Sequence, residues 1–154
     1  MRAGLLALTV AALGGSAQAQ QSVIDSIDMQ AVCAAADAHM DYFREHLASP
    51  APNETEFMLQ VIVPVSGKPG TKEYLWVTDL SPFATEGQGI LDDDAERLPL
   101  KKGDTLKFQR DMVCDWGFRR DGMMIGHYTT RAALTVLSPD VAMVVGAKLG
   151  RNPE

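Results

Sequence analysis

The sequence has too little positive charge to suit a nucleic-acid partner. It holds 14 Lys and Arg residues against 20 Asp and Glu residues, which gives a formal net charge of −6. A domain this acidic repels the phosphate backbone of DNA and RNA. We therefore expect no nucleic acid among its partners.

The sequence also lacks an apolar run that is long enough to cross a membrane. The run at residues 3–12 is well short of the ~20 residues that a spanning helix needs. It follows Arg2 and precedes Ala17-Gln18-Ala19, a small-x-small pattern that signal peptidase accepts. We therefore predict a cleaved signal peptide at 1–19 and a single globular domain at 20–154. The predicted location is periplasmic or secreted, in a bacterium.

No recognised catalytic motif is present. No Ser or Cys lies in a nucleophile elbow, and no glycine-rich loop precedes a helix. His39 and His46 fall on one predicted helix, but no His-x-x-x-His pattern completes a metal site. An enzyme would have only Asp115, His127 and Arg131 to draw on. We assign no catalytic residue, no metal and no cofactor, and a non-enzymatic role is favoured.

The first segment after the signal predicts an amphipathic helix. Asp28 is a suitable N-cap, and the helix should end near Ala48 because two prolines follow within residues 49–53. Apolar residues recur at helical spacing between these points. This stripe consists of Met29, Val32, Cys33, Ala36, Met40, Phe43 and Leu47.

Four later stretches are typical of strands, at residues 56–65, 72–80, 88–91 and 105–109. The acidic residues 92–94 interrupt this series. They lack the spacing of a calcium loop, so we interpret them as a solvated turn. Residues 111–118 and 126–131 then predict a hairpin around the Asp121-Gly122 turn signal.

The end of the chain predicts a short helix. Residues 132–137 fit a strand or a helix equally, but Ser138 suits an N-cap and Pro139 the first helical position. This helix should end at Gly150. The predicted fold class is α+β: an N-terminal amphipathic helix packs on a curved, mostly antiparallel sheet of about five or six strands, and a short helix closes the chain.

Cys33 and Cys114 are candidates for a disulfide. Cys33 lies on the helical stripe, and Cys114 alternates with Met112 and Trp116 on an apolar strand face. If the stripe and this face meet in the core, the two sulfur atoms come close, and an oxidising compartment favours the bond. Two buried free thiols are the alternative, which the spacing leaves open.

The predicted hairpin contains several residues that the packing of an apolar core does not require. Asp115 could pair with Arg131 or cap a turn, and either tryptophan could border a pocket. Structural roles are the alternative: core packing for both tryptophans, and for Asp115 a structural ion pair, which we favour over a ligand contact. The candidate binding surface consists of Glu73, Trp76, Asp115, Trp116, His127, Tyr128, Thr129 and Arg131.

A spaced set of residues carries a family resemblance. The set is Glu73-x-x-Trp76, Gly89-x-Leu91-x-Asp93, Gly103-Asp104, Asp115-Trp116 and Gly126-x-Tyr128-Thr129-x-Arg131. On these residues, over about 56–137, the chain resembles an exported member of the bacterial domain of unknown function 2314, a YegJ-like family. The family usually has Asn-x-Pro where this chain has Asp93-Asp94-Ala95, so we expect a differently built turn there. The resemblance implies a compact domain with no assigned activity.

Three functions remain open at this point. The first is a periplasmic binding or interaction module with an unknown protein or small-molecule partner. The alternative is an inhibitor or immunity-type protein for a basic partner such as a cell-wall-degrading enzyme, because opposite charge speeds association. A hydrolase is the least favoured, since no nucleophile–base pair is visible in the sequence. The sequence gives neither the ligand nor the oligomeric state.

Overall fold

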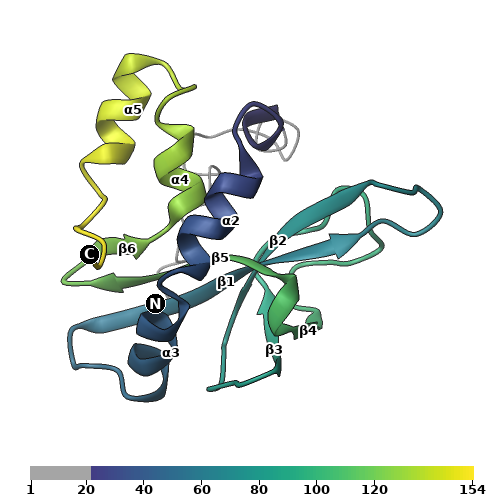
Figure 1. Cartoon of the computed structure of the whole chain (residues 1–154), viewed down its shortest axis with the longest axis horizontal. Coiled ribbons are helices and arrows are strands. Elements are labelled where there is room, and N and C mark those ends of the chain that lie inside the picture. Colours follow the sequence, from purple (N-terminus) through teal and green to yellow (C-terminus); the bar gives the residue numbers. More distant parts are fainter. Residues whose placement is uncertain (1–21) are drawn as a thin grey trace.

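The computed structural model of the protein describes residues 22–154 (Figure 1). The predicted signal peptide lies outside these residues. The described part of the chain has the predicted α+β fold, in which a six-stranded, open antiparallel sheet carries short helices. Within residues 22–154, no helix has the length and apolar character that crossing a membrane requires.

The strand order in the sheet is β4-β3-β2-β1-β5-β6, and every neighbouring pair is antiparallel. All four stretches that we predicted as strands before the hairpin are strands. The Asp121-Gly122 turn joins the last two strands, as predicted. The bounds are β1 Glu54–Pro64, β2 Lys72–Thr78, β3 Glu86–Leu91, β4 Thr105–Gln109, β5 Val113–Arg120 and β6 Met123–Gly126.

One face of the sheet forms the main core. Leu59 of β1 and Trp116 of β5 are register partners on this face, and both side chains are fully buried. Alternate residues of the neighbouring strands join them, and the two N-terminal helices close the core from outside. This face includes Val61, Val77, Leu91, Phe108 and Phe118 from the strands, and Ala36, Met40, Phe43 and Leu47 from the helices.

The predicted N-terminal helix is in fact two helices, α2 (Met29–Asp37) and α3 (Met40–Ala48). Asp28 caps α2 as predicted, because its carboxylate accepts a hydrogen bond from the backbone N–H of Ala31. The end at Ala48 is also as predicted. The single continuous helix is wrong.

A side chain from the sheet accounts for the break between α2 and α3. The indole Nε1 of Trp116 donates to the carbonyl oxygen of Ala36 at 2.8 Å. The same carbonyl accepts the N–H of His39, which closes a tighter turn than an α-helix has. A side chain that hydrogen-bonds to a backbone carbonyl of a helix competes with the hydrogen bonds of the helix itself, and this is a recognised cause of a kink or break.

The second strand of the predicted hairpin lies earlier in the chain than expected. β6 ends at Gly126, and α4 (Tyr128–Ala133) follows it, so the predicted strand at 126–131 is wrong for most of its length. The reason is long-range: the carboxylate of Asp115 accepts the backbone N–H groups of Tyr128 and Thr129, which fixes the start of the helix. The first hairpin strand begins late, after a 3₁₀ turn, η2 (Arg110–Met112).

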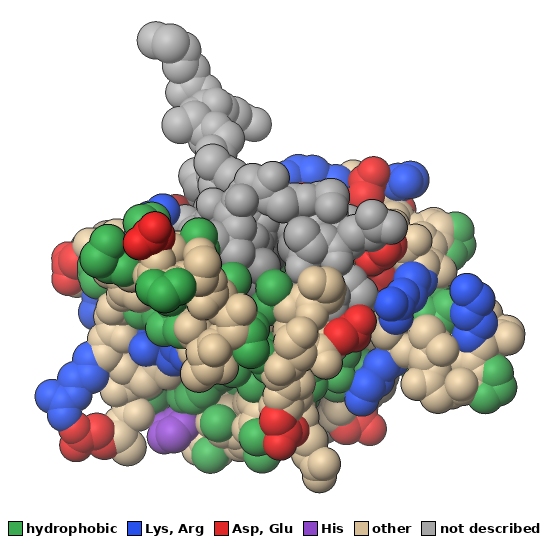
Figure 2. Space-filling view, turned by 90° about the horizontal axis from the view of Figure 1, so that it is seen from above, with side chains coloured by type: hydrophobic (Ala, Val, Ile, Leu, Met, Phe, Trp, Pro, Cys, Tyr) green, Lys and Arg blue, Asp and Glu red, His purple; other side chains and the backbone are tan. Residues whose placement is uncertain are grey.

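The C-terminal helix, α5 (Pro139–Gly146), has Pro in its first turn as predicted but ends before the predicted Gly150. Figure 1 shows α5 beside α4, which separates it from α2, at the β6 end of the sheet. Only Val145 of α5 is buried, and Met143 and Val144 are 70% and 57% exposed. Hydrophobic side chains accordingly reach the surface over this helix (Figure 2).

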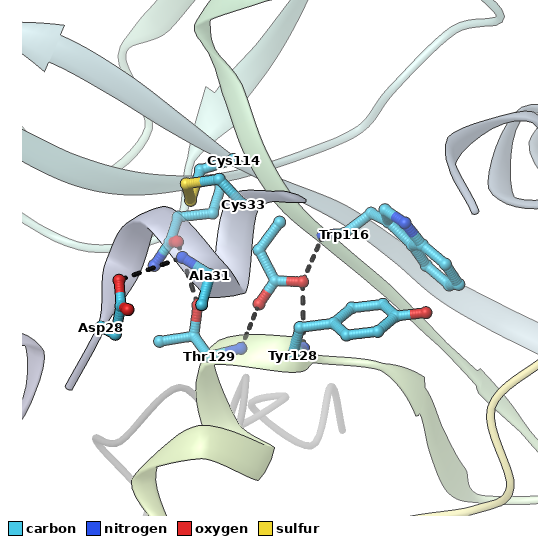
Figure 3. Close-up of a disulfide and its surroundings, with 9 residues drawn as sticks. Asp28, Ala31, Cys33, Cys114, Trp116, Tyr128 and Thr129 are labelled. Atoms are coloured by element: carbon cyan, nitrogen blue, oxygen red, sulfur yellow. Dashed lines mark hydrogen bonds between the residues drawn. A yellow bond between two sulfur atoms is a disulfide. The ribbon is translucent and has the colours of Figure 1, made fainter. Parts of the chain in front are cut away.

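Cys33 of α2 and Cys114 of β5 form a disulfide, with their Cα atoms 4.3 Å apart (Figure 3). The prediction of this pair is confirmed, and the alternative of two free thiols is excluded. Because Cys114 sits where the register between β1 and β5 shifts, the bond ties α2 directly to an irregular point of the sheet.

Candidate functional site

A pocket of about 520 Å³ opens where the first residues of β1 meet the last residues of β2 and β5. Its volume lies within the range of roughly 300–1,000 Å³ that is usual for small-molecule sites. Apolar and charged side chains share its wall. The lining residues are Leu47, Pro50, Glu56, Phe57, Met58, Thr78, Asp79, Leu80, Asp92, Arg119, Met124 and His127.

His127 is the only residue of the predicted binding surface that lines this pocket. It joins β6 to α4 in the left-handed conformation, with φ 52° and ψ 50°. The indole of Trp76 stacks on the imidazole, with ring centroids 5.5 Å apart. Gly117 leaves the space that the ring occupies, because a Cβ atom there would lie 2.2 Å from Nε2 of His127.

The imidazole of His127 is neutral at ordinary pH and incompletely hydrogen-bonded. Burial, with a smaller contribution from the positive charges of Arg119 and Arg131, lowers the pKa of His127 to about 3. Nδ1 is buried and has no hydrogen-bond partner among the described residues. Buried polar atoms nearly always have a partner, which is a protein group, an ordered water or a ligand.

Glu56 and Arg119 form an ion pair in the pocket wall, with Nε and Oε2 2.5 Å apart. Arg119 also donates from Nη1 to the carbonyl oxygen of Gly122. Glu56 lies in a bulge of β1, where the pairing with β5 shifts between Thr55 and Met58. The bulge directs a charged side chain of a central strand into the pocket.

Asp92 and Asp79 add two further carboxylates. The Asp92 side chain is only 16% exposed, and its nearest cation, Nζ of Lys102, is 3.9 Å away. Burial raises the pKa of Asp92, and Asp93 raises it further, while Lys102 opposes the shift. Asp79 is exposed at the pocket and makes no side-chain hydrogen bond or ion pair within residues 22–154.

Backbone strain is concentrated at the pocket. Four residues other than glycine have positive φ within the described chain, and three of them line the pocket. These three are Glu56, Asp79 and His127, whereas Asp121 belongs to the β5–β6 turn. Left-handed conformations of such residues require support from the surrounding structure and cluster at functional sites.

Asp115 has a structural role beside the pocket. It is fully buried, and its carboxylate accepts the backbone N–H groups of Trp116, Tyr128 and Thr129 at 2.7–3.0 Å. Burial raises the pKa of Asp115 to about 6, against these hydrogen bonds. Of the two predicted alternatives, the structure shows the cap of a turn.

Arg131 does not pair with Asp115 in the structure. Its guanidinium donates to the carbonyl oxygens of Gly126, Met124 and Gly150 instead. It thereby joins the end of β6 to the segment after α5. The partial negative charge of three carbonyl oxygens replaces the predicted carboxylate partner.

The side chains of the remaining residues of the predicted surface are buried or form hydrogen bonds with other residues of the domain. Glu73 is buried and accepts the backbone N–H groups of Glu96 and Arg97. The hydroxyl of Thr129 donates to Gln60, and that of Tyr128 contacts Nδ1 of His39 at 3.1 Å. Trp116 lies in the core, as described above.

Sequence reasoning missed Glu56, Asp79 and Arg119, since nothing in the local sequence indicates a bulge or a left-handed turn at these points. Asp92 had a weak signal as part of the acidic triplet. The solvated-turn interpretation fits the other two acidic residues, Asp93 and Asp94, which are exposed. Within residues 22–154, no three His, Cys, Asp or Glu side chains are placed to hold a metal ion.

Comparison with known proteins gives one result. No curated protein and no solved structure matches the chain. A family described as uncharacterized protein conserved in bacteria (DUF2314) matches residues 26–150, which extends the predicted region of about 56–137 to both the N-terminal helices and α5. The chain therefore belongs to the DUF2314 family.

Proposed function

We propose that the protein is a binding module that holds a small organic molecule in the pocket, and that it works in the periplasm or outside the cell. The location rests on the predicted signal peptide. The binding role rests on one observation: His127, in the wall of a pocket of about 520 Å³, has a buried ring nitrogen without a partner among the described residues.

The energetics of His127 support this role. A buried polar atom that lacks a hydrogen bond destabilises a fold by about 1–3 kcal/mol, and a left-handed backbone adds roughly 1–3 kcal/mol. The chain maintains both at one residue, and it fixes the ring between Trp76 and Gly117. A ligand group or an ordered water that bonds to the imidazole would recover part of this energy.

The pocket supports binding better than hydrolysis. Among the described residues its lining includes neither Ser nor Cys, and no nucleophile–base pair is formed there, since no side-chain hydrogen bond joins Thr78 or a carboxylate to the imidazole. A general base works best when its pKa lies near the operating pH, and the pKa of His127 is lowered to about 3. We therefore infer that the pocket binds a ligand and does not hydrolyse it.

A protein partner is the second candidate. Met143 and Val144 of α5 are neighbouring apolar residues with largely exposed side chains, which a protein partner could cover. This observation supports the inhibitor alternative, together with the acidic charge of the chain. Salt-sensitive capture of a basic protein on the immobilised domain, lost in Met143→Asp, would favour it.

A ligand screen with matched variants tests the proposed function. Residues 20–154 are purified oxidised and screened by ligand-observed NMR against a library of small cations, anions and neutral compounds. Leu80→Trp places a larger side chain in the half-buried pocket wall. Met143→Trp makes a similar change at an exposed residue of α5 that does not line the pocket, and is the control.

The expected result is a set of compounds that bind the wild-type domain and Met143→Trp but not Leu80→Trp. Compounds that bind all three proteins equally would overturn the proposal. A screen without any compound that depends on Leu80 would overturn it as well.

A further inference from the structure

The charged groups that line the pocket are mostly negative. Glu56, Asp79 and Asp92 face a single guanidinium, that of Arg119. Arg119 is already engaged, because it pairs with Glu56 and donates to the carbonyl oxygen of Gly122. The pocket therefore holds one neutral pair and two further carboxylates, and it would repel an anion.

Within residues 22–154, no positive charge lies closer than 3.9 Å to the largely buried carboxylate of Asp92. Its carboxylate is mostly removed from solvent, and Lys102 reaches it only at 3.9 Å from the exposed side. The backbone N–H of Asp92 donates to the carbonyl oxygen of Trp76, which holds the residue in place. A cation inside the pocket would compensate this carboxylate at close range, where solvent screens least.

The rest of the wall is apolar and suits a hydrocarbon chain. It is formed by Leu47, Pro50, Phe57, Met58, Leu80 and Met124. Flexible methionine side chains adapt to ligands of different shape. A ligand that matches the whole wall has an apolar body and a positively charged end.

The imidazole of His127 is neutral, so it does not repel a cation. Its Nδ1 has no hydrogen-bond partner among the described residues, and in the tautomer that carries the hydrogen on Nε2 this atom accepts a hydrogen bond. A protonated amine carries N–H donors as well as positive charge. We propose that the pocket binds an organic ammonium ion with a short apolar chain; this proposal depends on the pocket being a ligand site at all.

Three probes of equal chain length test the charge of the ligand. Hexylammonium, hexanol and hexanoate are titrated into the oxidised mature domain by calorimetry at low salt. We expect hexylammonium to bind about tenfold more tightly than hexanol, since tenfold corresponds to ~1.4 kcal/mol, a modest charge–charge contribution. Hexanoate should bind more weakly than hexanol.

Carboxylate variants locate the effect. Asp79→Asn/Asp92→Asn should reduce the affinity for hexylammonium to about that for hexanol, while the affinity for hexanol is unchanged. Asn also tolerates the left-handed backbone of residue 79. Asp111→Asn, at an exposed residue outside the pocket, should change neither affinity.

The outcomes separate this inference from the proposed function. Equal or better binding of hexanol or hexanoate that is lost in Leu80→Trp would overturn the ammonium class and leave the pocket as a ligand site. Library compounds that bind in a Leu80-dependent way while hexylammonium does not would have the same meaning. If no compound depends on Leu80, both proposals fail.

Discussion

The side chain of His127 occupies the space that any side chain at Gly117 would require. The two residues face each other across the β5–β6 hairpin, where Gly117 is the register partner of Gly126, the residue before His127. A Cβ atom at residue 117 would approach three ring atoms of His127 to between 2.2 and 2.7 Å. The absence of a side chain in a buried strand is therefore a condition for the position of the imidazole.

Gly117→Ala should destabilise the protein by about 1–3 kcal/mol, because overpacking forces the ring or the strand to move. Denaturant unfolding of the oxidised domain measures the change. Gly146→Ala is the matched control, since its Cβ atom would have Leu134 Cδ1 as its nearest neighbour at 4.0 Å. A Gly117→Ala protein as stable as this control would contradict the described packing.

Asp115→Asn should lower the free energy of unfolding by about 1–3 kcal/mol. An amide keeps only one acceptor oxygen, and its NH₂ group would face one of the N–H groups that the carboxylate accepts. Asp111→Asn serves as the exposed control. Unchanged stability together with a loss of ligand binding would show that the role of Asp115 is not structural.

The disulfide should account for a large part of the stability. It joins residues separated by 81 positions, for which the chain-entropy model gives about 4–5 kcal/mol. Cys33→Ala/Cys114→Ala should therefore unfold at a much lower denaturant concentration than the oxidised domain. Thiol labelling of the denatured, unreduced wild-type protein should detect no reactive thiol, and two per chain would refute the bond.

Acidification should destabilise the protein through His127. Its pKa is about 3 in the folded state and ~6.5 in the unfolded state, so the unfolded state takes up the proton first as the pH falls through this window. Asp115 acts in the opposite direction between about pH 6 and 4, because its folded pKa is raised to about 6.

Comparison of the wild-type protein with His127→Asn isolates the contribution of the histidine, and asparagine suits the left-handed backbone. Between pH 6.5 and 4, the wild-type protein should lose about 2–3 kcal/mol more than the variant, at ~1.4 kcal/mol per pKa unit. His39→Asn controls for the loss of a histidine outside the pocket. Parallel pH profiles of the wild type and His127→Asn would rule out a buried, neutral imidazole.

Export predicts a defined mature terminus. If signal peptidase cleaves after Ala19, the protein recovered from its own cells begins at Gln20, and its net charge is −7, because 13 basic residues then stand against 20 acidic ones. Intact-mass measurement of the native protein checks this. Recovery of a chain that retains Arg2 would contradict the predicted location.

Local patterns predicted those parts of the fold that local physics determines. Alternation identified the strands, and the Asp28 cap and the Asp121-Gly122 turn depend on neighbouring residues only. The break between α2 and α3 was not predictable in this way, since the indole that takes the Ala36 carbonyl lies 80 residues further along the chain. Likewise, Thr129 belongs to a helix because a distant carboxylate binds its N–H.

The pocket could not be predicted from the sequence for the same reason. The sequence marks Trp76 and His127 as unusual, but their stacking depends on the packing of four strands, β2, β1, β5 and β6. Glu56 and Asp79 enter the site through left-handed backbone conformations that no local sequence pattern indicates. Tertiary structure, rather than composition, brings the carboxylates together.

The central place of β1 in the sheet has a consequence for synthesis of the chain. One neighbour, β2, follows directly, but the other, β5, begins only at Val113. Until that residue is available, one edge of β1 presents unpaired N–H and C=O groups beside Leu59 and Val61, a combination that promotes pairing between chains. A chain that is truncated before β5 would therefore be prone to aggregate.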